Sequence, residues 1–94
     1  MMFAEKIKQL REERQIPQRV FAAALEIDTA TYCKIEKGER QAKKEYIPII
    51  ATILIADEKE LLTLWLADKV TAVVGNEKKI STKALDIVKN NLRE

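Results

Sequence analysis

The sequence predicts an all-α protein, and three observations support this fold class. Apolar residues recur at the three- and four-residue spacing of amphipathic helices along most of the chain. The 94 residues include only two glycines and two prolines, so few positions interrupt a helix. Residues that favour helix starts, such as Asp28 and Asp57, precede two of the apolar segments. A chain of this length forms one compact unit near the lower size limit for an independent core.

The first two predicted helices span residues 3–14 and 18–25. An apolar stripe with helical spacing defines the first, and it consists of Phe3, Ile7 and Leu10. The second follows Pro17, whose fixed φ and missing N–H suit the entrance of a helix. Its apolar stripe consists of Phe21, Ala22 and Leu25.

A third helix is predicted over residues 29–37. The Asp28 carboxylate can accept from its first free N–H groups, and Gly38 can take the left-handed conformation that ends it. One face is expected to point toward the core and carries Tyr32, Ile35 and Glu36. The opposite face is small, polar and basic, which is what a helix reading the DNA major groove requires. That face carries Thr29, Ala30, Cys33 and Lys34.

Three more helices are predicted over residues 45–55, 58–74 and 82–92. Pro48 falls in the first turn of the fourth, where its missing N–H costs nothing. Gly75 and Asn76 are expected to end the fifth, residues 77–79 to form a polar connector, and Ser81 to cap the last.

The fifth helix carries more apolar residues than one face can hold. A small monomer cannot bury all of them, and such a surplus indicates a partner surface. The residues predicted for a dimer interface are Leu62, Trp65, Leu66 and Val70. Three placements of the last helix stay open: folded back on the fifth helix, exchanged onto a second subunit, or frayed.

The segment from Pro17 to Gly38 resembles the signature of the phage-repressor-like (Cro, XRE) helix-turn-helix family. The residues that carry the resemblance are Gln18, Ala22, Asp28, Ile35, Glu36 and Gly38. Two positions depart from the family pattern, because Glu26 and Ile55 stand where glycine is usual after the second and fourth helices.

The resemblance implies a five-helix lambda-repressor-like DNA-binding domain over residues 1–66. An additional C-terminal helical extension over residues 67–94 is then expected to serve dimerisation. It also implies a sequence-specific transcriptional regulator of double-stranded DNA in a prokaryote, a homodimeric repressor that reads an inverted repeat. The alternative is an antitoxin or another interaction module whose C-terminal helices bind a partner protein.

The resemblance also implies roles for individual residues. Base contacts are expected from Thr29, Ala30, Cys33 and Lys34. Phosphate contacts are expected from Gln18, Arg19, Lys37, Arg40, Lys43 and Lys44. A structural ion pair between Arg11 and Glu36 would tie the first helix to the third. The basic surplus agrees with this division, since residues 1–44 hold ten Lys or Arg against seven acidic residues.

Composition argues against an enzyme, a metal site and a cofactor. The chain has no histidine, so it lacks an imidazole base and a His-rich metal site. Its single cysteine, Cys33, excludes an intrachain disulfide. Two interpretations of Cys33 stay open, a small residue tolerated in the groove or an oxidisable thiol on the DNA face. The N-terminal residues lack a leader pattern, and residues 47–56 are too few to cross a bilayer, so a cytoplasmic location is expected.

Overall fold

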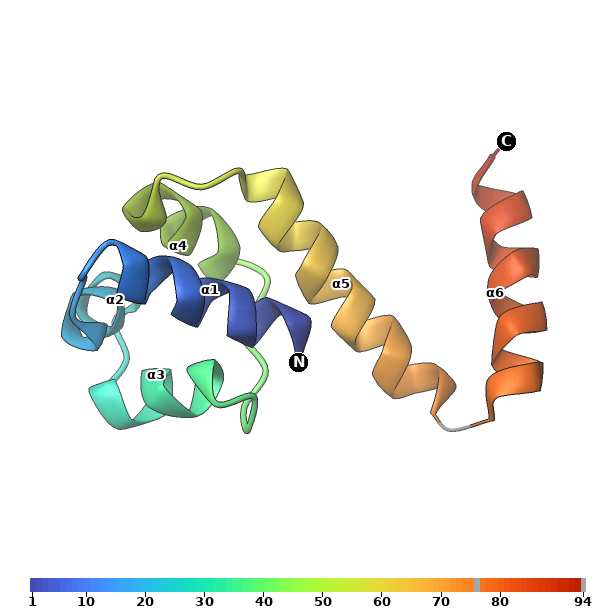
Figure 1. Ribbon diagram of the computed structural model, residues 1–94, viewed down its shortest axis with the longest axis horizontal. Coiled ribbons are helices and arrows are strands. Elements are labelled where there is room, and N and C mark those ends of the chain that lie inside the picture. The colour runs from blue at the N-terminus through green and yellow to red at the C-terminus, as the bar shows by residue number, and fades with distance from the viewer. Residues whose placement is uncertain (76, 94) are drawn as a thin grey trace.

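The computed structural model describes residues 1–75 and 77–93, and within them it contains six helices and no strand. Helices α1 to α4 pack together, the first half of α5 lies against α1 and α4, and α6 stands away from this globular part (Figure 1). This arrangement confirms the predicted all-α class. The helices are α1 Met2–Glu13, α2 Gln18–Leu25, α3 Thr29–Glu36, α4 Tyr46–Leu54, α5 Glu58–Val74 and α6 Lys78–Leu92.

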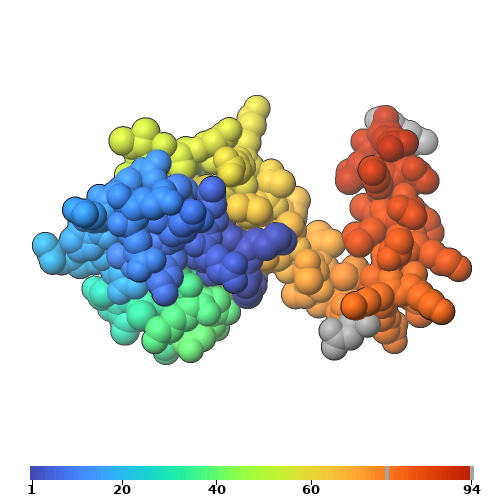
Figure 2. Space-filling view, in the orientation of Figure 1, coloured from blue at the N-terminus to red at the C-terminus, as the bar shows by residue number. Residues whose placement is uncertain are grey.

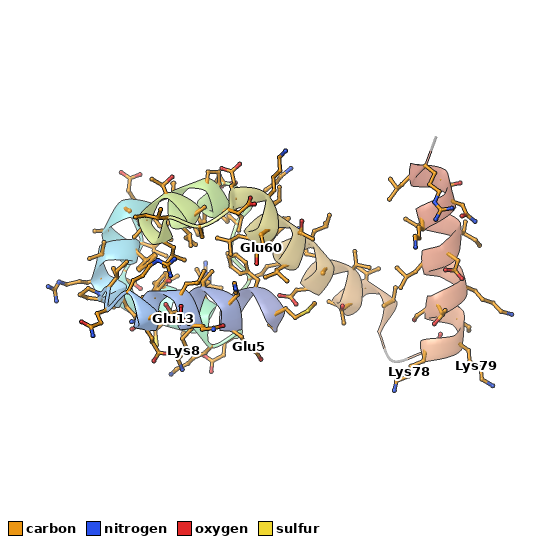
Figure 3. All side chains as sticks on the ribbon, turned by 45° about the horizontal axis from the view of Figure 1, so that its top comes forward. Glu5, Lys8, Glu13, Glu60, Lys78 and Lys79 are labelled. Atoms are coloured by element: carbon orange, nitrogen blue, oxygen red, sulfur yellow. The ribbon has the colours of Figure 1, made fainter. Side chains whose placement is uncertain are left out.

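The start of α6 differs from the prediction. The helix begins at Lys78 rather than residue 82, and Lys78 and Lys79 project from its first turn (Figure 3). Ser81 does not cap it, because its hydroxyl donates to the carbonyl of Val74, 3.0 Å away. Lysine is a good helix former and neither glycine nor proline follows, so the helix extends toward α5. Asn76, expected to end the fifth helix with Gly75, lies outside the described residues.

The core gathers aliphatic and aromatic side chains from α1 to α5. Phe21 and Tyr32 stack with ring centroids 5.2 Å apart, which joins α2 to α3. Offset-stacked rings at this separation add stability beyond the area that they bury. The most deeply buried large side chains are Ile7, Phe21, Tyr32, Ile47, Ile50, Leu54 and Leu61.

Helices α2 and α4 both end in a left-handed residue that is not glycine. Glu26 has φ 59° and Ile55 has φ 52°, so the two departures from the family pattern keep the turn conformation that glycine would adopt. After α4 the next amide closes the turn, because the Ala56 N–H donates to the Ala51 carbonyl. These turns therefore store strain rather than change the helix arrangement.

Asp68 ties the middle of α5 to the start of α1, a contact that the sequence did not predict. Its carboxylate accepts from the backbone N–H groups of Met2 and Phe3, at 3.0 and 2.9 Å. A carboxylate there satisfies free donors and complements the helix dipole. Helix α5 also runs without a break through the boundary predicted between residues 66 and 67. The globular part therefore reaches at least residue 68.

The arm beyond this point is apolar but thinly packed. None of the described residues of α6 is buried. Within residues 1–75 and 77–93, no helix has the length and hydrophobicity needed to span a membrane.

Candidate nucleic-acid interface

Helices α2 and α3 form a helix-turn-helix whose second helix is capped as the sequence predicted. The Asp28 carboxylate accepts from the Thr31 N–H at 2.6 Å. The hydrogen bonds from Thr31 hold the pKa of Asp28 below its usual value. In the turn, the Ile27 N–H donates to the Ala22 carbonyl at 3.0 Å. The start of α3 is therefore fixed relative to α2.

Helix α3 buries one face and exposes the other. Tyr32, Ile35 and Glu36 are buried toward the other helices. The four residues predicted to contact bases lie on the rest of its surface. Thr29, Ala30 and Lys34 are exposed, and Cys33 is half-buried. A short helix with a free face of this composition can enter a major groove.

Basic side chains gather near the end of α3. The loop to α4 is held by the Lys34 carbonyl, which accepts from the N–H groups of Glu39 and Arg40 at 2.9 and 3.3 Å. Gly38 takes φ 77° at the start of this loop. The predicted phosphate contacts that are exposed are Arg19, Lys37, Arg40, Lys43 and Lys44. Four of them, from Lys37 to Lys44, follow α3 in the chain, so the segment after this helix carries exposed cations.

The ion pair expected between α1 and α3 is present and is shielded from solvent. Arg11 Nε lies 2.6 Å from Glu36 Oε2, and Arg11 Nη2 lies 3.0 Å from Glu36 Oε1. The Glu36 side chain is 2% exposed and the Arg11 side chain 15%. The hydrogen bond to Glu36 raises the pKa of Arg11. A two-point contact of this kind fixes both orientation and distance.

Gln18 belongs to the same network, a role that the sequence analysis missed. Its side-chain amide donates to Glu36 Oε1 at 3.2 Å, so α1, α2 and α3 meet at one carboxylate. Arg11 also donates to the Ile16 carbonyl at 3.1 Å. The sequence held a signal for this contact, because Gln18 and Glu36 belong to the same family signature. Whether the two side chains meet, however, depends on the angle at which α2 and α3 cross. The network holds Gln18 next to the end of α3.

The Tyr32 hydroxyl is buried beside this network. Within the described part of the chain, it has no hydrogen-bond partner. Burial, together with the neighbouring Glu36 carboxylate, raises the pKa of Tyr32 far above its usual value. The ring of Tyr32 therefore packs in the core, and its hydroxyl oxygen has no hydrogen-bond partner among the described residues.

Trp65 does not lie on an exposed surface, which corrects its prediction as a residue of the dimer interface. It is 7% exposed, and its indole N–H donates to the Ala42 carbonyl at 2.7 Å. The loop after α3 folds back over α5 and covers it, a long-range contact that helical periodicity cannot reveal. Leu62 is half-buried against the same core. Of the four predicted interface residues, Leu66 and Val70 remain exposed.

Comparison with known proteins identifies the domain. A family model described as a helix-turn-helix domain matches residues 3–64, about two thirds of the chain. Comparisons with curated proteins and with solved structures gave no match. The matched segment contains α2, α3, the Arg11–Glu36 pair and the basic loop, and DNA binding in transcription regulation is the role that such a domain indicates. The chain therefore belongs to the helix-turn-helix domain family, in agreement with its resemblance to phage-repressor-like regulators.

Proposed function

We propose that this protein is a sequence-specific, double-stranded DNA-binding transcriptional regulator that reads base edges through α3. Its proposed role is binding rather than catalysis, and it requires no cofactor. The observation that carries the proposal is a capped α3 with an exposed face of Thr29, Ala30 and Lys34, followed by a basic loop. A free helix face next to several cations offers both base contacts and phosphate contacts.

Lys34 is the strongest candidate for base recognition. Its ammonium can donate to guanine O6 or N7, Thr29 can donate or accept, and Ala30 can contact a thymine methyl group. The predicted base-reading residues include no Arg, Asn or Gln, the residues with the most selective two-point geometry. Sequence-dependent DNA shape then supplies part of the specificity.

The finer proposal is a homodimeric repressor on an inverted repeat. Two copies of α3 would enter successive major grooves on one side of the duplex, with half-site centres about 10 bp apart. Repression would follow from occupation of a promoter. The exposed Leu66 and Val70 support self-association, because a monomer gains nothing from leaving such side chains in water.

Selection of bound fragments from random DNA at near-physiological salt tests this proposal. We expect an inverted repeat from the parent protein. Lys34→Ala should relax the preference at one position of each half-site, at a cost of about 1–3 kcal/mol in specific binding. Lys59→Ala, on the exposed start of α5, is the matched control and should select the same sequence.

A second candidate function is supported by the thinly packed arm. A protein-interaction module, such as an antitoxin, would use the C-terminal helices to bind another protein. Weak, salt-sensitive DNA binding with no selected motif would favour this candidate. Recovery of a motif that Lys34→Ala alters would favour the regulator.

A further inference from the structure

Helix α5 presents two apolar faces, and one of them packs on the core. Leu61 and Trp65 are buried on the core face. Leu66, Val70 and Val73 fall on a different side of the same helix and are all exposed. The side chains of the second face therefore do not pack on the core of the globular part.

A groove of about 500 Å³ separates this second face from α6, and it opens between the two helices in the space-filling view (Figure 2). Apart from the Lys69 side chain, its lining is aliphatic. We call it the arm groove, and its lining includes Leu66, Val70, Val73, Ala84, Leu85 and Val88.

The apolar surface of α6 is wider than its contact with α5 requires. Ala84, Leu85 and Val88 line the arm groove. Ile80 and Ile87, seven residues apart, form a second line on the helix, which we call the outer stripe; they are 65% and 62% exposed. A helix of this length is marginal in water without tertiary packing. Helix α6 therefore needs a neighbour on the side of the outer stripe.

The exposed apolar area fits a stable dimer. The exposed fractions of the large aliphatic residues from Leu66, just before the arm, to Leu92 add up to about five whole residues. This is roughly 300–500 Å² of aliphatic surface in each chain. A standard interface buries about 800 Å² on each side, of which about 500 Å² is apolar. The arm alone supplies most of that amount.

We propose that the arm groove of each chain is filled by α6 of a second copy, which inserts its outer stripe. The inference rests on the proposed homodimer and names its interface. Each chain carries both an unfilled groove and an unpartnered stripe, so two copies can satisfy each other through one two-fold axis. A helix from another protein would fill the groove but would leave Ile80 and Ile87 in water. Lys78, Lys79 and Lys89 lie away from the outer stripe, and Lys83, which borders it, can extend its ammonium into the solvent.

Sedimentation equilibrium of the full chain without DNA provides the first test. We expect a dimer at micromolar concentration. Ile87→Asp in the outer stripe and Val70→Asp in the arm groove should each weaken association at least about 100-fold, because an unpaired carboxylate would enter an apolar contact. Lys79→Asp also places a carboxylate on α6, away from the outer stripe and the arm groove, and should leave the dimer intact. Circular dichroism should show that all three variants keep the parent helix content.

A complementary pair of variants tests which residues meet. Ile87→Asp and Val70→Lys should each be monomeric alone, whereas their mixture should form a heterodimer. In that heterodimer, Asp at position 87 of one chain faces Lys at position 70 of the other, and the second contact keeps both parent residues. Failure of the mixture to associate would overturn the proposed exchange. A parent chain that stays monomeric near 100 µM would overturn it as well. So would a dimer that persists in both the Ile87→Asp and the Val70→Asp variants.

The outcome separates this inference from the proposed function. A chain that dimerises through the arm but selects no DNA motif would support the proposed interface and contradict the proposed function as a regulator. If the parent chain selects an inverted repeat and the Ile87→Asp variant stays dimeric, the proposed function as a regulator is supported and the proposed interface is contradicted.

Discussion

At the residue scale, Glu36 is the carboxylate on which three helices depend. It receives two hydrogen bonds from Arg11 and one from Gln18 while almost fully shielded from water. Removal of one partner from such a site leaves the other charge without compensation. Stability and the position of α3 are therefore linked through a single side chain.

We expect Glu36→Ala to lower the free energy of unfolding by about 3–5 kcal/mol, because the Arg11 guanidinium would lose its partner in a poorly hydrated site. Urea denaturation monitored by circular dichroism measures the change. Glu13→Ala, on the exposed end of α1, is the control and should change stability by less than about 0.5 kcal/mol. A Glu36→Ala chain as stable as the parent would show that the pair contributes nothing to folding.

Tyr32→Phe should leave stability at pH 7 unchanged or raise it by about 1 kcal/mol, since the buried hydroxyl is unpaired among the described residues. The pKa of Tyr32 is raised in the folded state, so the folded chain keeps the phenol proton where the unfolded chain begins to release it. Its contribution to stability is therefore complete below pH of about 10 and declines as the pH rises above that value.

Thermal unfolding of the parent and the Tyr32→Phe variant at pH 7 and pH 11 measures this dependence. The parent should lose more stability between the two values than the variant does. Equal losses would mean that Tyr32 ionises as easily in the folded chain as in the unfolded chain.

At the scale of elements, the sequence predicted most helices because their determinants are local. Asp28, Asp57 and Pro17 mark helix starts, and the apolar stripes identify the faces that pack on the core. The features that it did not predict depend on distant contacts. The burial of Trp65 depends on a carbonyl 23 positions earlier, and the role of Asp68 depends on amides more than 60 positions away. The surface of α3 was predictable, whereas the Gln18–Glu36 contact required the crossing of α2 and α3.

The end of α4 offers a direct test of stored strain. Ile55 is β-branched, 86% exposed and has a left-handed backbone, a conformation that costs roughly 1–2 kcal/mol for such a residue. Ile55→Gly should therefore stabilise the fold by up to about 1 kcal/mol, after allowance for the greater freedom of glycine in the unfolded chain. Urea denaturation measures the difference. Lys8→Gly, in the middle of the regular helix α1, should instead destabilise by about 1 kcal/mol.

At the scale of the whole molecule, cations on the loop after α3 should govern the strength of DNA binding rather than its selectivity. We expect Lys43→Ala and Lys44→Ala to weaken binding to all sequences alike. Each should reduce the slope of log K against log salt by about 0.9, the value for one lost phosphate contact. Fluorescence anisotropy over a range of salt concentrations measures the slope. A change of selected sequence in either variant would place these side chains on bases instead.

Helix α5 is both part of the core and the base of the arm, and in the proposed dimer this sets the geometry of the operator. It is continuous over 17 residues, about 26 Å, and Asp68 at its middle anchors α1. The two recognition helices would then be joined by rigid rods instead of a pliable tether. One base pair inserted between half-sites turns one of them by about 35° around the duplex axis. A rigid pair of rods cannot follow that rotation, so affinity should depend sharply on operator spacing.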